Sequence, residues 1–494
     1  MKSSEDTLRQ LDESPLSSFH FKTVLTSGMG FFTDAYDLFI IGVVSTILKN
    51  VWHISTLQIS LLSSTALLSA ALGAIVFGRV ADRFGRKFVY GYELIVLAAG
   101  AIASALAPNV FWLLFFRFIL GLGIGGDYPV SATLMSEYSN RYDRGKLITL
   151  VFSTQALGLI FGPLLTVLML ISGVNLDLTW RILLGVGAIP ALATFWLRRQ
   201  IAESPRFSLA HGNVKEAEQA VQMVMKGRGD GGECDGIHRQ LTDGSFEKIN
   251  PAIKVVEDGD GVRVQPGRKV SARELFTTRH LLIWLIGAAG TWFFLDVSYY
   301  GTTVSTPLVI KLFSPQTTLI QTMLYTLLIF VVAALPGYIV AALTIDRIGR
   351  KRMQLLGFAM MALSYGVLFL FPALTQITWT FLLAYGLSYF FTEFGPNVTT
   401  FVLPAEIFPV AARTTAHGIA AAVGKVGAFI GAFLFPLLLS NPAFRLPGAM
   451  GVAAFVALAG FALTFVLPEP DHKTLEMIER EGEREDQQVD MKAR

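Results

Sequence analysis

The chain holds twelve apolar stretches that are each long enough to cross a lipid bilayer. A membrane-spanning helix needs about 20 mostly apolar residues, because every backbone polar group must find a partner inside the segment. With 53% hydrophobic and 16% charged residues, the chain lacks the polar surface of a water-soluble protein. The sequence therefore predicts an all-α integral membrane protein with spans near 23–48, 57–79, 88–107, 110–138, 147–171, 180–199, 280–306, 319–343, 352–373, 377–403, 413–439 and 447–467.

A charged hexapeptide occurs twice, as Asp82–Lys87 (DRFGRK) and as Asp346–Lys351 (DRIGRK). Each copy lies in the short gap between the second and third span of a group of six. Such an internal repeat predicts two pseudo-symmetric six-helix bundles. It is typical of transporters that rock one half against the other around a central site.

The basic residues predict the orientation, since Lys and Arg of the short gaps gather in the even-numbered gaps. Both termini and the long connection between the halves are therefore expected to be cytoplasmic. The expected organisation is a cytoplasmic N-terminal segment (1–22), a first bundle (23–199), a cytoplasmic linker (200–279), a second bundle (280–467) and a cytoplasmic tail (468–494). Within the linker, 213–226 is expected to be an amphipathic helix and 227–261 to be flexible.

Several functional classes are disfavoured. The net charge of +3 is too small to indicate a nucleic-acid partner, and the single cysteine, Cys234, allows no intramolecular disulfide. The N-terminal segment has no apolar core typical of a removable signal peptide. No catalytic triad, metal-ligand cluster or phosphate-cradling loop is recognisable, so we expect no enzymatic activity, no metal and no cofactor.

Charged residues inside the predicted spans are the candidates for function, because each costs roughly 2.5–3.5 kcal/mol to insert. They are Asp34, Asp37, Glu93, Arg117, Asp127, Asp296, Glu393 and Lys425. A structural pair and a functional role are equally open for Glu93 and Arg117. A functional role is favoured for Asp34, Asp127, Asp296 and Lys425, since they lie near mid-depth.

These charges follow the repeat. The offset between the hexapeptides places the first-span aspartates near Asp296, Asp127 near Glu393, and Gln155 near Lys425. Polar groups of both halves should therefore meet at one central site.

The predicted seventh span contributes one polar face to that site. Trp292, Asp296 and Tyr300 are spaced four apart and so share one side of a helix. With Tyr128, Asn397 and the buried ammonium of Lys425 they form a donor-rich site that suits an oxyanion.

Matched acids and arginines lie at the expected cytoplasmic ends of the fourth and tenth spans. Glu137 and Arg144 are seven residues apart, as are Glu406 and Arg413. With the hexapeptides they could form a gate of salt bridges that breaks when the inner side opens. The predicted gate residues are Asp82, Arg86, Glu137, Arg144, Asp346, Arg350, Glu406 and Arg413. A role in topology alone is the alternative.

Longer motifs carry a family resemblance. The two hexapeptides and the ESPRF run at 203–207 resemble the major facilitator superfamily and its sugar-porter-like branch. The motifs GFFTDAYDLF (30–39), GGDYPVSATLMSE (125–137), WFFLDVSYYG (292–301) and GPNVTTFVLPAEIFP (395–409) resemble the proton-coupled inorganic phosphate symporters of fungi and plants.

The resemblance implies roles at matching positions. Phosphate would be held by Tyr128, Gln155, Trp292, Asp296, Tyr300, Asn397 and Lys425. Protons would be carried by Asp34 and Asp127, with Asp37, Glu93 and Arg117 along the proton route. Glu393 departs from the pattern, because those symporters usually have a small polar residue there. An additional acid beside the site could change the proton stoichiometry or disfavour a divalent anion.

The resulting hypothesis is a secondary active transporter that imports inorganic phosphate with protons by alternating access, as a monomer in the plasma membrane. Proton coupling is expected, because importing an anion against an inside-negative potential costs about 2.3 kcal/mol per charge per 100 mV. Two alternatives stay open. One is a proton-coupled carrier of another solute, such as an organic anion, a sugar or a polyol. The other is a phosphate sensor with little transport.

Overall fold

The computed structural model describes most of both halves. The described residues are 11–140, 142–199, 201, 203–210, 213–226, 255–258, 261–264, 273–471, 473, 477–478, 480–482, 484 and 486–487. Within them the chain is almost entirely helical.

The first half folds into six spans, three of which are divided into two helices. The helices are α2 (Ser18–Val51), α3 (Thr56–Phe84), α4 (Arg86–Val89), α5 (Tyr92–Ala105), α6 (Val110–Tyr138), α7 (Arg144–Ser153), α8 (Gln155–Ile171), α9 (Leu176–Val186) and α10 (Ala188–Arg198). The divisions fall at Gly91, Thr154 and Gly187. The predicted 110–138 span is one continuous helix despite Pro129, which lies inside α6.

The second half repeats this plan. Its elements are α15 (Arg279–Val304), α16 (Thr306–Phe313), α17 (Leu319–Ile329), the π-helix η2 (Phe330–Ala334), α18 (Leu335–Ile348), α19 (Arg350–Leu370), the 3₁₀-helix η3 (Pro372–Gln376), α20 (Thr378–Phe394), α21 (Pro396–Ile407), the 3₁₀-helix η4 (Val410–Ala412), α22 (Arg413–Ser440) and α23 (Arg445–Thr464).

Eleven spans of the described chain are long and apolar enough to cross a membrane. The predicted span 377–403 is not among these eleven. Its helix ends at Phe394 and a separate helix begins at Pro396. Proline has no N–H to donate, and its ring disfavours the helical conformation of the preceding residue, here Gly395. The break faces protein, where irregular backbone at membrane depth can be tolerated.

The connection between the halves contains α11 (Pro205–Ala210), α12 (Val214–Lys226) and α14 (Glu274–Thr277). A helix therefore lies where an amphipathic one was expected. Of the expected flexible stretch 227–261, residues 227–254 lie outside the described part of the chain. From residue 255 onward the structure differs from the expectation, since β1 (Val255–Asp258) pairs antiparallel with β2 (Gly261–Val264). Valines in both segments and a Gly-Asp pair between them in the sequence favour this hairpin.

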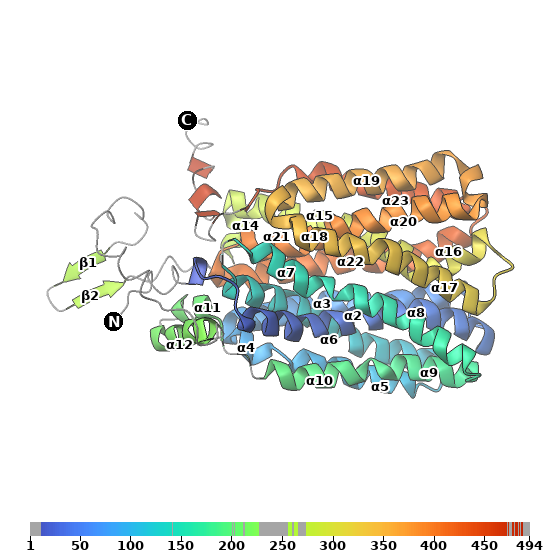
Figure 1. Ribbon diagram of the computed structural model, residues 1–494, viewed down its shortest axis with the longest axis horizontal. Coiled ribbons are helices and arrows are strands. Elements are labelled where there is room, and N and C mark those ends of the chain that lie inside the picture. The colour runs from blue at the N-terminus through green and yellow to red at the C-terminus, as the bar shows by residue number, and fades with distance from the viewer. Residues whose placement is uncertain are drawn as a thin grey trace.

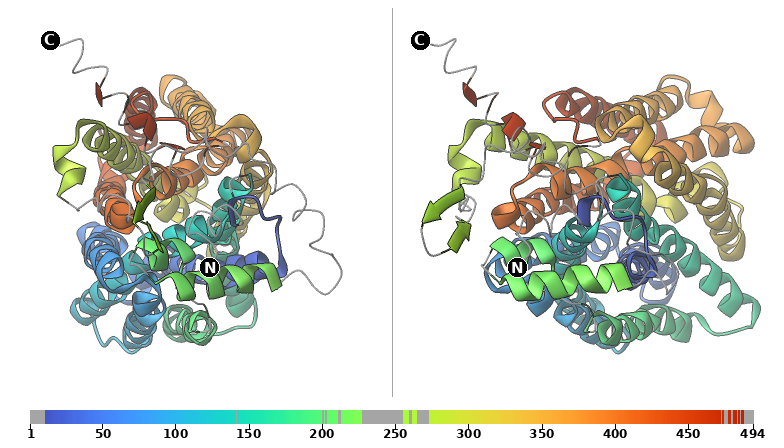
Figure 2. Two further views of the ribbon diagram at one scale, coloured as in Figure 1. Left: turned by 90° about the vertical axis from the view of Figure 1, so that its left-hand side faces the viewer. Right: turned by 60° about the vertical axis from the view of Figure 1, so that its left-hand side comes forward.

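The two halves lie side by side with their helices running in one common direction (Figure 1). Viewed along the helices, the blue-to-green first half forms one group and the yellow-to-red second half the other (Figure 2). They meet where α3 packs against α22 and where α7 and α8 pack against α18 and α17. We call the end that carries both hexapeptides the basic end, and the other the opposite end. Asp12 and Asp486, near the two ends of the described chain, also lie toward the basic end, beside Arg144 and His280.

The outer surface of the bundle is apolar. Large side chains such as Ile189, Trp196 and Phe455 are about 70% exposed, at 68%, 70% and 73%. Charged side chains such as Asp34, Arg198 and Lys425 are instead buried inside. This distribution is the reverse of a water-soluble protein and suits a hydrocarbon surround.

Candidate functional site

A buried ammonium lies at the meeting point of the halves. Lys425 on α22 donates from Nζ to Asp296 Oδ2 at 3.2 Å and to the hydroxyl of Tyr300 at 2.9 Å. Its Nζ also lies over the rings of Tyr128 and Tyr300, at 4.3 and 4.5 Å from their centroids. We call Lys425, Asp296, Tyr300, Tyr128 and Trp292 the central cluster. All five are at most 2% exposed.

Helical spacing builds this cluster. Trp292, Asp296 and Tyr300 follow one another by one turn on α15, so they face the same side. Tyr128 reaches them from α6 in the other half, with its hydroxyl 3.5 Å from that of Tyr300. The predicted convergence of both halves is therefore seen in the placement of these side chains.

A second group of polar side chains lies beside the central cluster. Asn397 donates to the Tyr338 hydroxyl at 2.7 Å and also to a carboxylate oxygen of Glu393. Tyr338 in turn donates to Gln155 Oε1 at 3.4 Å, which links the two halves. We call Gln155, Tyr338, Asn397 and Glu393 the lateral cluster. Gln155 and Asn397 thus reach each other through Tyr338, a residue that the sequence analysis did not single out.

A layer of aromatic rings closes the site toward the basic end. Phe152 and Phe401 stack with centroids 4.4 Å apart, and Phe31 lies edge-on to Phe401 at 5.0 Å and to Tyr128 at 5.3 Å. The rings come from both halves. This layer must separate before a solute can pass from the clusters to the basic end.

Asp127 lies in a buried ion-pair network. Arg198 at the end of α10 bonds both its carboxylate oxygens at 2.8 Å and reaches Glu93 Oε1 at 2.7 Å. Ser131 also donates to Asp127. We call Asp127, Glu93 and Arg198 the arginine network. Gly30 makes room for it on α2, because any side chain there would collide with Asp127 and Arg198.

The other predicted proton carrier, Asp34, and Asp37 on the predicted proton route lack such direct partners in the described part of the chain. Asp34 is fully buried one helical turn beyond Gly30, and neither of its carboxylate oxygens has a hydrogen-bond partner among the described residues. The same holds for the carboxylate of Asp37. Arg117 donates to the backbone oxygen of Asp37 at 2.8 Å. The pairing of Glu93 with Arg117 that the sequence left open is therefore not the one observed, since Glu93 pairs with Arg198.

Arg198 is the functional candidate that sequence reasoning missed. It falls in an Arg-Arg pair at the end of a span, which resembles an ordinary topology signal. A finer signal was available, because Ala188, Ala191, Thr194 and Arg198 follow a three- or four-residue spacing and are the buried positions of α10. That spacing points Arg198 inward and leaves Arg199 exposed.

The predicted gate residues lie together at the basic end. Arg86 bonds Glu137 at 3.0 Å within the first half, and Arg350 bonds Glu406 at 2.9 Å within the second. Arg413 reaches Glu137 across the halves at 3.5 Å. Arg144, another predicted gate residue, lies 3.6 Å from Asp12 of the N-terminal segment.

Each hexapeptide aspartate binds the start of a helix in the other half. Asp82 accepts from the backbone N–H of Thr415 at 2.5 Å, in the first turn of α22. Asp346 accepts from the N–H of Lys146 at 2.8 Å, in the first turn of α7. Carboxylates at helix N-termini satisfy free N–H groups and the positive end of the helix dipole. These two symmetric caps connect the halves at the basic end.

The two hexapeptide turns are also built alike. Gly85 and Gly349 have φ of 103° and 92°, a conformation that L side chains rarely adopt. Beyond each turn a carboxylate accepts two backbone N–H groups: Glu203 those of Arg86 and Lys87, Glu469 those of Arg350 and Lys351. Burial is the main cause that raises the pKa of Glu203 and of Glu469.

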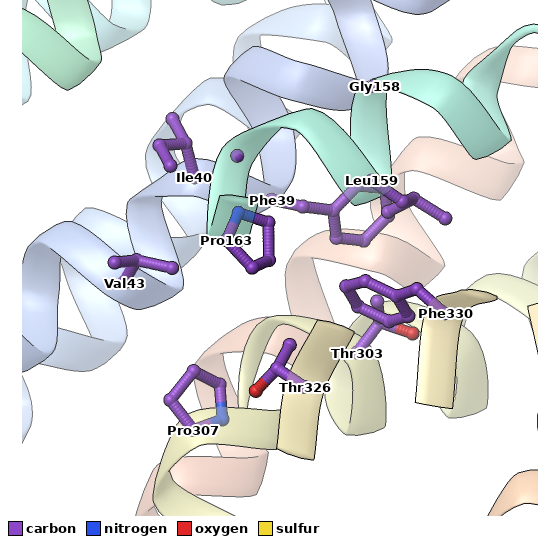
Figure 3. A pocket seen from close by; sticks show the side chains of 11 residues that line it. Phe39, Ile40, Val43, Gly158, Leu159, Pro163, Thr303, Pro307, Thr326 and Phe330 are labelled. Carbon is purple, nitrogen blue, oxygen red and sulfur yellow. The ribbon is translucent and has the colours of Figure 1, made fainter. Parts of the chain in front are cut away.

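A small cavity lies on the opposite side of the site from the gate. Ile40, Val43, Leu159 and Pro163 of α2 and α8 face Thr303, Pro307, Thr326 and Phe330 of the second half across it (Figure 3). In α2, α8 and α15, the residues that line the cavity lie in the helical turns that follow Asp34, Gln155 and Tyr300. The ring of Phe39 lines the cavity and stacks on Tyr300 at 5.2 Å. Phe39 and Tyr300 therefore separate this cavity from the central cluster.

The described residues contain no group of three or more His, Cys, Asp or Glu side chains placed to hold a metal ion. Arg198 pairs with Asp127 and Glu93, and Lys425 pairs with Asp296.

Comparisons with known proteins agree with this architecture. Residues 19–481 match the family model described as sugar (and other) transporter. Inorganic phosphate transporter 1-11 of Oryza sativa subsp. japonica is 35% identical, covering 96% of this chain and 90% of its own. Probable inorganic phosphate transporter 1-6 of Arabidopsis thaliana is 34% identical, covering 97% of each. The proton:xylose symporter XylE, solved with 6-bromo-6-deoxy-D-glucose, matches with a TM-score of 0.72 at 21% identity, over 94% of this chain and 99% of its own.

The fold and the buried two-half site define an integral membrane transporter and not an enzyme. The chain belongs to the sugar (and other) transporter family of the major facilitator superfamily, and the expected twelve-span fold of two six-helix bundles is confirmed.

Proposed function

We propose that this protein imports inorganic phosphate together with protons, by exposing its central cluster alternately to the two faces of the membrane. The observation that carries the proposal is Lys425, a buried ammonium held by one carboxylate and two phenols where the halves meet. The relatives named as inorganic phosphate transporters support this choice of anion.

The central cluster offers phosphate both charge and hydrogen bonds. Lys425 supplies the positive charge, while Tyr128, Tyr300 and Trp292 supply neutral donors. Asp296 can only accept when it is ionised, so it favours an anion that carries its own P–OH donors. A fully deprotonated tetrahedral anion such as sulfate would place oxygen against oxygen there. Phosphate would enter by taking over the bonds that Lys425 makes to Asp296 and Tyr300.

Asp34 is the simplest proton carrier in this mechanism. A buried carboxylate without a partner is costly, and binding a proton removes its charge. Asp127 takes its proton differently, because Arg198 must first release it. Glu93 keeps Arg198 paired during that step, so that no unpaired guanidinium is left in the interior. Asp37 and Arg117 lie one turn further toward the opposite end, along the proposed proton route.

Proton binding and gating are linked by Asp127, which lies on α6, the helix that carries Glu137 in its last turn. We infer that neutral Asp34 and Asp127 permit the closed state with phosphate bound. Separation of the caps at Asp82 and Asp346 then opens the basic end. Release of the protons on that side resets the carrier. With more protons than anion charges per cycle, the membrane potential drives import.

The proposed function also includes an orientation, a membrane and an oligomeric state. The concentration of Lys and Arg at the basic end supports a cytoplasmic location for that end and for both termini. A plasma membrane location fits uptake of an external nutrient. Each chain contains a complete central cluster from its own two halves, which supports function as a monomer.

Uptake into liposomes tests the function directly. The purified protein is reconstituted, and labelled phosphate is followed under imposed pH and voltage gradients. We expect accumulation that needs an acidic outside and that unlabelled phosphate abolishes, whereas sulfate, organic anions, sugars and polyols leave it unchanged. Competition by one of those solutes without competition by phosphate would replace the proposed substrate. Stoichiometric binding of phosphate without turnover would indicate a sensor.

Two substitutions test the proton carriers. Asp34→Asn and Asp127→Asn each remove one titrating group while nearly keeping its shape, and both should abolish gradient-driven accumulation. Exchange of labelled for unlabelled phosphate, which needs no net proton movement, separates a coupling defect from loss of binding. Wild-type accumulation in either variant contradicts the assigned role.

A further inference from the structure

Glu393 is a buried acid for which the described residues provide no cation. It is 0% exposed, and no Lys, Arg or His within the described ranges forms an ion pair with it. The other buried acids of the second half differ, since Asp296 pairs with Lys425 and Glu406 with Arg350. One oxygen of Glu393 accepts from Asn397, while the other, Oε1, has no hydrogen-bond partner among the described residues.

The surroundings of Glu393 are phenols instead of charges. Tyr299 of α15 and Tyr338 of α18 lie beside the carboxyl, and Tyr365 of α19 lies further out in the same region. Asn397 of α21 approaches the carboxyl from a fourth helix. Neutral groups of this kind can stabilise either protonation state, because a hydroxyl donates to a carboxylate and accepts from a carboxylic acid.

A ladder of hydroxyl groups leads away from this site toward the opposite end. The hydroxyl of Tyr365 lies 3.4 Å from that of Thr302, and Tyr385 donates to the Thr302 backbone oxygen at 3.1 Å. Thr306 lies 3.2 Å from the Tyr385 hydroxyl and 2.8 Å from that of Tyr389. These groups connect four helices of the second half, α15, α16, α19 and α20.

The ladder ends next to the small cavity. Thr303 and Pro307, which lie near Thr306 in the chain, both line the cavity. Phe330 also lines it, and its ring centroid is 5.7 Å from that of Tyr389. The hydroxyl ladder therefore lies between the small cavity and the surroundings of Glu393. The acids of the first half take no part in it.

We propose that Glu393 is a second-half proton-binding site, loaded from the opposite end through the hydroxyl ladder and coupled to the substrate site through Asn397. This assignment rests on the proposed function and deepens it. The step is a simple protonation. The carboxylate of Glu393 becomes neutral by gaining one proton from a hydronium ion at the opposite end, which is left as water. It gives up that proton after the carrier has turned toward the basic end.

Coupling to the solute follows from the contacts of Asn397. The same amide binds Glu393 and the Tyr338 hydroxyl, and Tyr338 reaches Gln155 of the first half. When Glu393 is ionised, it holds the amide N–H. When Glu393 is neutral, it competes for that group less strongly, so Asn397 can turn toward an anion in the site. Neutral Glu393 also adds no negative charge against that anion.

The test compares wild type with Glu393→Gln in proteoliposomes. The number of protons per phosphate is obtained from the voltage at which labelled phosphate shows no net flux under fixed gradients. We expect the variant to transport with one proton fewer per phosphate. Its limiting accumulation should then fall about tenfold for each 59 mV of proton-motive force. Thr392→Val on the preceding position of α20 is the matched control and should keep the wild-type ratio.

A variant of the ladder keeps the proposal testable if Glu393→Gln does not fold. Tyr385→Phe removes one hydroxyl and retains the ring, so turnover should slow several-fold while the proton ratio stays at the wild-type value. Unchanged proton ratio in Glu393→Gln, or unchanged turnover in Tyr385→Phe, would overturn the assignment. Absence of phosphate accumulation by the wild type would instead overturn the proposed function.

Discussion

The two halves share a fold but neutralise their buried acids differently. In the first half Asp127 and Glu93 are held by the guanidinium of Arg198 at 2.7–2.8 Å. In the second half Lys425 serves Asp296 alone, while Glu393 is surrounded by phenols and an amide. One half therefore holds Asp127 and Glu93 in a shared ion-pair network, whereas the other surrounds Glu393 with neutral groups.

This difference indicates a division of labour. Breaking a buried ion pair is expensive, so the arginine network should move only in a step that also supplies a proton. Hydroxyl groups exchange donors and acceptors at little cost, which suits a binding site that must accept and release an anion. At the basic end, in contrast, the halves are alike, with one aspartate cap and one turn-binding glutamate each.

Removing Arg198 should have the largest effect on stability and transport, because it disrupts the ion-pair network of the first half. Arg198→Ala leaves Asp127 and Glu93 buried without their cation, a change that typically costs about 3–5 kcal/mol. We expect strongly lowered thermal stability in detergent and no transport. Arg199→Ala alters the exposed neighbouring arginine and is the control, for which both measurements should stay near wild type. A stable, active Arg198→Ala protein would show that the network is dispensable.

The ion pair of the central cluster should respond to single and double substitution in opposite ways. Lys425→Gln leaves Asp296 unpaired and should lower both stability and phosphate binding. Adding Asp296→Asn removes the orphan charge, so unfolding temperature should recover by an amount equivalent to about 1–3 kcal/mol. Phosphate binding, measured by calorimetry, should stay lost in both variants. Recovered binding in the double variant would place the anion elsewhere.

The caps at the basic end should have a moderate effect that is similar in both halves. Asp82→Ala and Asp346→Ala each remove one helix cap, worth about 0.5–2 kcal/mol, and so shift the population toward a state open at that end. In a Cys234→Ser background, a cysteine placed at Ser136, which donates to the Ala405 carbonyl across the halves, should then be labelled faster. Arg83→Ala, at an exposed position of the same hexapeptide, should leave the labelling rate unchanged.

The smallest expected effect concerns Glu203 and Glu469, where the halves match. Because burial raises the pKa of each in the folded protein, the folded state binds more protons than the unfolded state at pH values just above 4.5. Stability should therefore fall as pH rises through that window. Glu203→Gln and Glu469→Gln should each flatten this slope in thermal unfolding from pH 4.5 to 7. A slope that stays the same in both variants would assign it to other groups.

Local sequence patterns predicted several features that the structure contains. Twelve apolar stretches, a repeated hexapeptide and buried charges at mid-depth are properties of short segments, and a helix forms within its own segment. The four-residue spacing of Trp292, Asp296 and Tyr300 fixed their common face for the same reason. The break at Gly395 also has a local cause in Pro396.

The partners of these groups were decided by tertiary structure. Which base holds Glu93 depends on how α5 and α10 are rotated and packed, and these helices are some 100 residues apart, so no spacing rule separates Arg198 from Arg117. The same is true of Tyr338 between Gln155 and Asn397, and of the aspartate caps that cross between the halves. The sequence determined which side chains had to be buried, because the bilayer sets that cost residue by residue. Only the packing of distant helices decided which of them would meet.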